Sequence, residues 1–154
     1  MKNEKKKRVK RRVGDLIAIP LESGYAYGRV LRMPLVAFYD LKSKNLLPPE
    51  KVLPAPIAFR ILVMNRPIVD GSWPVLGNFD LEARFMVETH FFKKDSFTGA
   101  LTRQKFGDSH EEPATLEACK KLERKAVWSL IHVVDRLADH FAGRPNQFVE
   151  SLKV

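Results

Sequence analysis

GDLIAIPLESGYAYGRVL, residues 14–31, is the stretch that decides the fold. Its first part, Leu16 to Leu21, is a nearly continuous apolar run, which is typical of a strand buried on both faces. The next three residues, Glu-Ser-Gly, are typical of a turn because glycine can adopt a positive φ there. From residue 25 the sequence alternates, and this places on one strand face Tyr25, Tyr27, Arg29, Leu31 and Met33. We therefore predict two strands joined by a short turn.

The rest of the chain predicts more strands, followed by helices. Apolar runs predict strands at residues 35–40, 57–64 and 73–77, with a short proline-opened helix at 48–53. Residues 91–95 and 101–106 are expected to pair with each other, and 107–113 to form a polar, acidic loop. Short strands with tight turns and then helices indicate the α+β class. We expect a bent antiparallel sheet or an SH3-like partial barrel, with the C-terminal helices packed against it.

Two C-terminal helices are predicted from their capping residues. Thr115 is suited to cap a helix that runs to Lys125, because its hydroxyl can accept a backbone N–H bond. Ser129 is suited to cap a second helix in the same way. This second helix would carry on one face Leu130, Val134, Leu137 and Phe141, before the stop signal of Gly143 and Pro145.

The composition bounds the class of protein. A chain of 154 residues is most simply one domain with a core that needs no disulfide, and its one cysteine, Cys119, has no internal partner. This cysteine usage suits a reducing compartment, so we expect a cytoplasmic protein. No apolar run reaches the length of a membrane span, and the charged N-terminus is not followed by the apolar region of a secretory signal. We therefore expect no membrane partner.

The positive charge is concentrated at the N-terminus. The formal net charge is +9, and residues 1–12 contribute eight cations and one glutamate, or 8 − 1 = +7. A like-charge block of this kind repels itself, so we expect a disordered basic arm at 1–12 and a single domain at 13–154. The arm has two interpretations: a solubilising terminus, or a salt-sensitive, sequence-blind contact with nucleic acid. The second interpretation would use Lys5, Lys6, Lys7, Arg8, Lys10, Arg11 and Arg12.

Three blocks of sequence resemble the immunity protein 26 family of bacterial polymorphic toxin systems. The first runs from Gly14-Asp15 through Ile19-Pro20-Leu21 to Tyr27-Gly28-Arg29-Val30. The second is PLVAFYDL at 34–41, with Phe59-Arg60 and Gly71-Ser72-Trp73 downstream. The third joins Ala126-Val127-Trp128, Asp135-Arg136-Leu137 and HFAGRPN at 140–146.

The resemblance spans about residues 13–152 and has two departures. Residues 129–132 read Ser-Leu-Ile-His where the family often has Asp-Pro-Glu-His, and Phe148 stands where tryptophan is common. The resemblance implies an antidote that binds and neutralises a cognate toxin protein. No motif of the family identifies the chemistry of that toxin.

Two surfaces are candidates for contact with such a partner. Tyr25, Tyr27 and Arg29 on one strand, with Phe38 and Asp40 on the next, are residue types that dominate protein interfaces. The alternative interpretation is the edge of a core whose tyrosine hydroxyls reach water. The second surface is acidic: residues 108–123 hold five carboxylates, Glu111 and Glu112 among them, against two lysines. It would attract a basic toxin, or it is a solvated loop and helix start.

No arrangement of residues indicates an enzyme. The chain has no phosphate-binding loop, serine elbow or glycine-rich dinucleotide turn. His132, Asp135 and Asp139 share a helical face, but no separate ligand cluster accompanies them, so we expect no metal and no cofactor. Cys119 lacks a neighbouring histidine or cysteine in the sequence and is expected to be a packed thiol.

Overall fold

Three long antiparallel strands form the centre of a six-stranded sheet. They are β1 (Asp15–Leu21), β2 (Gly24–Arg32) and β3 (Leu35–Ser43). The computed structural model describes residues 11–154, so of the predicted basic arm only Arg11 and Arg12 belong to the described residues. The two strands predicted from the opening stretch are confirmed, and their register pairs Leu21 with Gly24 across the turn.

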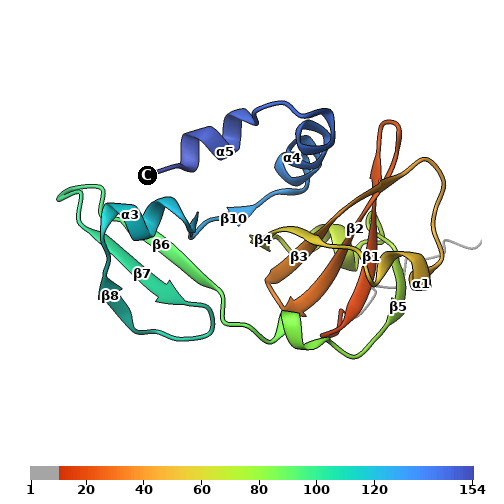
Figure 1. Ribbon diagram of the computed structural model, residues 1–154, viewed down its shortest axis with the longest axis horizontal. Coiled ribbons are helices and arrows are strands. Elements are labelled where there is room, and N and C mark those ends of the chain that lie inside the picture. The colour runs from red at the N-terminus through yellow and green to blue at the C-terminus, as the bar shows by residue number, and fades with distance from the viewer. Residues whose placement is uncertain (1–10) are drawn as a thin grey trace, which may run out of the picture.

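The order of this sheet is β10-β4-β3-β2-β1-β5 (Figure 1). The outer strands are β4 (Ile57–Val63), β5 (Val75–Asn78) and β10 (Val127–Trp128). We expected an antiparallel sheet, but strand β10 pairs with β4 in the parallel sense, so the sheet is mixed. Short helices connect the strands: α1 (Pro49–Val52) and α2 (Arg66–Val69). Sheets of strands together with helices confirm the α+β class. Both sheets in the described residues are open, so neither closes into a barrel.

A second sheet of four strands, in the order β8-β7-β6-β9, lies beside the first (Figure 1). Its strands are β6 (His90–Lys94), β7 (Leu101–Lys105), β8 (Glu111–Pro113) and β9 (Glu123–Arg124). The predicted pairing of β6 with β7 is confirmed. The predicted loop over 107–113 is wrong at its end, because residues 111–113 pair with β7 as strand β8.

The helices at the C-terminus differ in length from the prediction. Helix α3 (Leu116–Lys120) is capped by Thr115 as predicted but stops five residues early, because residues 123–124 pair with β6 as strand β9. Helix α4 (Leu130–Ala142) is capped by the Ser129 hydroxyl and ends at Gly143, whose φ is 68°. A further helix, α5 (Gln147–Leu152), follows and was not predicted.

The central sheet buries both faces, as the opening apolar run predicts. One face packs on α4 and α5 through residues such as Ile17, Phe38, Trp73 and Leu137. The other face holds Leu16, Tyr27, Tyr39 and Val52, and also Phe91 of the second sheet. Because one apolar cluster includes side chains of both sheets, the sheets share a core. The prediction of a single domain over 13–154 stays a prediction.

Candidate partner-binding surface

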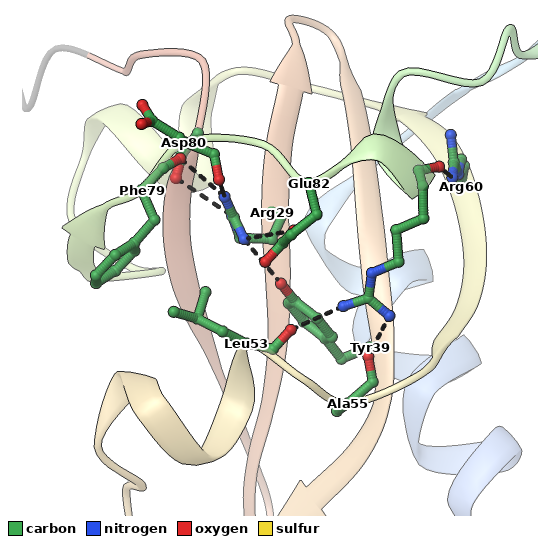
Figure 2. A network of polar contacts seen from close by, with 10 residues as sticks. Arg29, Tyr39, Leu53, Ala55, Arg60, Phe79, Asp80 and Glu82 are labelled. Atoms are coloured by element: carbon green, nitrogen blue, oxygen red, sulfur yellow. Dashed lines mark hydrogen bonds and ion pairs between the residues drawn. The ribbon is translucent and has the colours of Figure 1, made fainter.

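A buried arginine lies at the centre of the network in Figure 2, and this arginine is one of the predicted contact residues. The side chain of Arg29 is 0% exposed. Its Nε donates to the carbonyl oxygen of Gly14 at 3.2 Å, and its Nη1 donates to the Tyr39 hydroxyl at 3.2 Å. Its Nη2 donates to the carbonyl oxygens of Phe79 at 2.9 Å and Asp80 at 3.4 Å. All three guanidinium nitrogens are thus satisfied inside the protein.

Two of the partners of Arg29, Phe79 and Asp80, belong to the connecting segment, residues 79–89, which joins β5 to β6 and includes the 3₁₀ turn η1 (Ala83–Phe85). Arg29 also lies 3.6 Å from a carboxylate oxygen of Glu82, whose side chain is half-exposed. Burial raises the pKa of Tyr39, and the Arg29 hydrogen bond acts in the opposite direction. The sheet therefore binds the connecting segment mainly through the backbone carbonyl groups of that segment.

Two further arginines hold the same segment. Arg84 donates from its two terminal nitrogens to the carbonyl oxygens of Leu53 and Ala55, both at 2.7 Å. Arg60, on β4, donates to the carbonyl oxygen of Arg84 at 2.7 Å. Burial lowers the pKa of the Arg60 guanidinium. The guanidinium groups of Arg29, Arg60 and Arg84 all lie within 6 Å of the Phe85 ring centroid, in the range of cation–π contacts. These contacts fix the path of the chain from the first sheet to the second.

Three of the predicted contact residues are therefore core residues. Tyr27, Arg29 and Phe38 are all 0% exposed, so none of them reaches the surface in this structure. They also lie on different faces of the sheet: Phe38 pairs with Gly28, and so lies on the face opposite to Tyr27 and Arg29. Each face is covered by its own apolar cluster. The Tyr27 hydroxyl does not reach water either, because it bonds to the Ser43 hydroxyl at 2.6 Å and accepts from the Leu47 amide at 2.9 Å.

The two remaining residues of that predicted surface lie on opposite faces of the sheet. Tyr25 is half-buried and packs with the cluster that contains Tyr27. Asp40 is exposed and lies 2.7 Å, from its Oδ1, from Nε2 of His140 on α4. The single surface predicted from Tyr25, Tyr27, Arg29, Phe38 and Asp40 is thus not formed.

The His140 contact belongs to a row of side chains that runs along α4. The His140 ring lies edge-on to Phe59 of β4. The guanidinium carbon of Arg136 lies over the same ring, 3.8 Å from its centroid. Arg136 also makes two hydrogen bonds to the carboxylate of Glu123, at 2.7 and 3.0 Å. Because Glu123 belongs to β9, this row joins α4 to both sheets.

The predicted acidic surface is largely neutralised by its neighbours. Glu111 pairs with Lys93 on β6, and the lysine lowers the pKa of that carboxyl mainly through the hydrogen bond. Glu112 pairs with Arg103 on β7. Both glutamates are at least partly exposed, but they complete ion pairs across the second sheet instead of presenting unpaired negative charge.

Other predicted features have structural roles in the described part of the chain. Within residues 11–154, no group of three or more histidine, cysteine, aspartate or glutamate side chains is placed to hold a metal ion. His132 stacks on Phe148 with ring centroids 4.1 Å apart, and Cys119 is buried. No helix among the same residues is long and apolar enough to cross a membrane.

One exposed feature was missed in the sequence. Phe97, at the turn between β6 and β7, is 96% exposed, whereas the other phenylalanines of this sheet, Phe91 and Phe92, are buried. The signal that marks the turn is Asp95 followed four residues later by Gly99, whose φ is 74°. Aspartate at the start of a loop and glycine at a position with positive φ are both typical turn residues.

Comparison with known proteins identifies one family. The model of the family described as immunity protein 26 matches residues 12–98, which include β1 to β6, the connecting segment and Phe97. No curated protein matches the chain, and no solved structure does. The match thus covers the buried arginine network and ends inside the turn that carries the exposed phenylalanine.

Proposed function

The chain belongs to the immunity protein 26 family, and from this premise we propose that it neutralises a cognate toxin by binding it. The toxin would belong to a bacterial polymorphic toxin system, and one copy of the chain would cover one copy of the toxin. The observation that carries this proposal is the family match over residues 12–98. We further propose that the protein acts in the cytoplasm, where a lone cysteine suits reducing conditions.

The framework of the fold supports a binding role. An antidote that works by obstruction has to present a surface that loses little conformational entropy on binding. The three arginines at Phe85 fix the connecting segment by backbone hydrogen bonds, and the second sheet follows directly from that segment. The side chains of both sheets therefore keep a defined spacing, which suits a rigid contact surface.

The described residues favour binding over catalysis. The one contact between a serine hydroxyl and a histidine ring, Ser129 with His132 at 3.2 Å in the described part of the chain, lies at a helix start. There the Ser129 hydroxyl accepts the backbone N–H of His132, which is the ordinary bond of a helix cap. We therefore propose that the protein has no enzymatic activity of its own.

Co-expression with the toxin encoded beside this chain tests the proposal. Cells that express the toxin alone should stop growing, and cells that express both proteins should grow. The matched control is an immunity protein from a different toxin system, which should not rescue growth. Absence of rescue together with absence of a complex on gel filtration would contradict the proposal.

A second candidate function rests on the basic arm. Eight of the 27 lysines and arginines of the chain lie in its first twelve residues. We propose, as the alternative, a nucleic-acid contact through Lys5, Lys6, Lys7, Arg8, Lys10, Arg11 and Arg12, the first five of which lie outside the described residues. Retention on double-stranded DNA should then weaken steeply with salt and be lost when residues 1–12 are deleted. Equal retention of the deletion variant would refute this role for the arm.

A further inference from the structure

The loop between β6 and β7, residues 95–100, carries the most exposed large apolar side chain of the described residues. Phe97 is 96% exposed, and the next most exposed, Met86, is at 72%. Figure 1 shows this green loop at the left end of the molecule, away from the six-stranded sheet. A phenylalanine in this position contributes nothing to the core, so its role has to be sought outside the fold.

The loop is held in shape by its own hydrogen bonds. The Oδ1 atom of Asp95 accepts from the backbone N–H groups of Phe97 at 2.8 Å and Thr98 at 2.9 Å. The carbonyl oxygen of Asp95 accepts from Gly99, and the Thr98 hydroxyl accepts from Ala100 at 3.2 Å. Because the loop is already ordered, little backbone entropy remains to be lost when Phe97 is bound.

The same hydrogen bonds lower the free-energy cost of removing the loop from water. The backbone N–H groups of residues 97 to 100 all have an acceptor inside the loop, so burying them leaves no donor unsatisfied. Next to the loop, the charges of Lys93 and Arg103 are already paired with Glu111 and Glu112. Lys94, directly before the loop, stays exposed. A loop whose backbone donors are satisfied internally fits an apolar pocket better than one with unsatisfied donors.

From these observations we propose that Phe97 is the anchor of this protein in its complex with the toxin. The phenyl ring enters an apolar pocket on the toxin surface, and the loop backbone packs against the rim of that pocket. Buried aromatic side chains that fill a pocket dominate the binding energy of most protein interfaces. This inference rests on the proposed function, and it adds the residue and the chemical class of surface that the partner has to offer.

Titration calorimetry of the full-length chain with a catalytically inactive form of the toxin encoded beside it tests the anchor. Phe97→Ala should weaken binding by about 30-fold or more, the usual loss at an interface hot spot. Phe97→Trp keeps a large aromatic ring and should bind within about fivefold of the wild type. Asp95→Ala removes the acceptor that shapes the loop and should also weaken binding. Because Phe97 is exposed, the melting temperature of Phe97→Ala should equal that of the wild type.

Ile131→Ala is the matched control, because Ile131 is also apolar and exposed, at 67%, but lies on α4. Its affinity for the toxin should equal that of the wild type. If the wild type binds and Phe97→Ala binds equally well, the anchor is refuted and the proposed function stands. If the wild type does not bind the toxin at all, the proposed function fails and the anchor with it.

Two other surfaces could accept the Phe97 ring, and parallel measurements distinguish them from the toxin. Sedimentation of the wild type and of Phe97→Ala with vesicles of phosphatidylcholine and phosphatidylglycerol tests whether the ring enters a lipid surface. Light scattering of both proteins without toxin tests whether the ring binds a second copy of this chain. Our proposal predicts no difference between the two proteins in either measurement. Loss of vesicle binding or of a dimer in Phe97→Ala would contradict the assignment to the toxin.

Discussion

Nη2 of Arg29 lies 2.9 Å from the carbonyl oxygen of Phe79, fifty positions further along the chain. This contact joins the central strand β2 to the connecting segment that leads to the second sheet. An arginine is suited to the position because its planar guanidinium directs donors toward several acceptors at once. Arg29 therefore helps to hold the two sheets in a fixed relation.

Removal of Arg29 should destabilise the fold. Arg29→Met keeps the apolar stem but removes the side-chain donor to the carbonyl oxygens of Phe79 and Asp80 and to the Tyr39 hydroxyl. The carbonyl oxygen of Gly14 keeps its bond from the Phe79 amide. We expect a loss of about 3 kcal/mol or more in the free energy of unfolding, measured by urea denaturation. The control, Arg103→Ala, breaks an exposed ion pair and should cost less than about 1 kcal/mol. A loss below about 1 kcal/mol in Arg29→Met would show that the network contributes little to stability.

Substitution of Gly24 should lower the stability of the fold, because a backbone oxygen lies too close for a side chain. Gly24 has a φ of 129°, and a Cβ atom there would lie 2.2 Å from the carbonyl oxygen of Ser43. Gly71 also has a positive φ, 83°, but a Cβ atom there would meet nothing within 4 Å. In thermal or urea unfolding, Gly71→Ala should cost about 1 to 2 kcal/mol from backbone strain alone, and Gly24→Ala clearly more. Equal losses in the two variants would mean that the clash at Ser43 is relieved without cost.

The stability of the β6–β7 loop should depend on pH through Asp95. The backbone N–H groups of Thr98 and Phe97 donate to this carboxylate and hold its pKa below the ordinary value. A carboxyl with a lowered folded-state pKa stabilises the fold above its unfolded pKa, and that contribution is lost as the pH falls through the folded value. Between about pH 5 and pH 2 the wild type should therefore lose more stability than Asp95→Asn, which carries no titrating group. Urea unfolding at several pH values measures this difference, and parallel pH profiles would contradict it.

The pair of Arg136 and Glu123 should couple α4 to the second sheet. Their two parallel hydrogen bonds, at 2.7 and 3.0 Å, have the geometry of the strong bidentate pairs. A double-mutant cycle with Arg136→Met and Glu123→Gln should give a coupling energy of about 1 to 2 kcal/mol in unfolding experiments. The comparison pair, Lys120 with Glu117, is exposed and separated by 3.4 Å, so its coupling should stay below about 0.5 kcal/mol. Similar values for the two pairs would contradict the structural role of Arg136.

Local patterns in the sequence predict much of this fold. The apolar run of β1, the turn at Gly24 and the helix between Ser129 and Gly143 are confirmed, because each depends on residues close together in the chain. The predicted extension of helix α3 to Lys125 is wrong, because the structure there depends on residues far away in the chain. Strand β9 pairs with β6 more than thirty residues away, and no local pattern in two residues carries that pairing.

The candidate site was harder to predict than the fold. Alternation placed Tyr27 and Arg29 correctly on one strand face, but sequence alone does not show that this face is buried by the connecting segment. Phe38 was assigned to the wrong surface, because the register that pairs it with Gly28 depends on an irregularity between residues 30 and 32 of β2. Phe97 lies in a loop predicted only as the link between two strands, and its exposure follows from the tertiary structure.

The most direct test of the account is a titration of the toxin's own activity with the purified chain. If the chain neutralises the toxin by covering it, residual toxin activity should fall linearly and reach zero at one chain per toxin. At the same molar ratio, Phe97→Ala should leave most of the activity at concentrations where the wild type abolishes it. Toxin activity that remains constant at a molar excess of the wild-type chain would contradict the account.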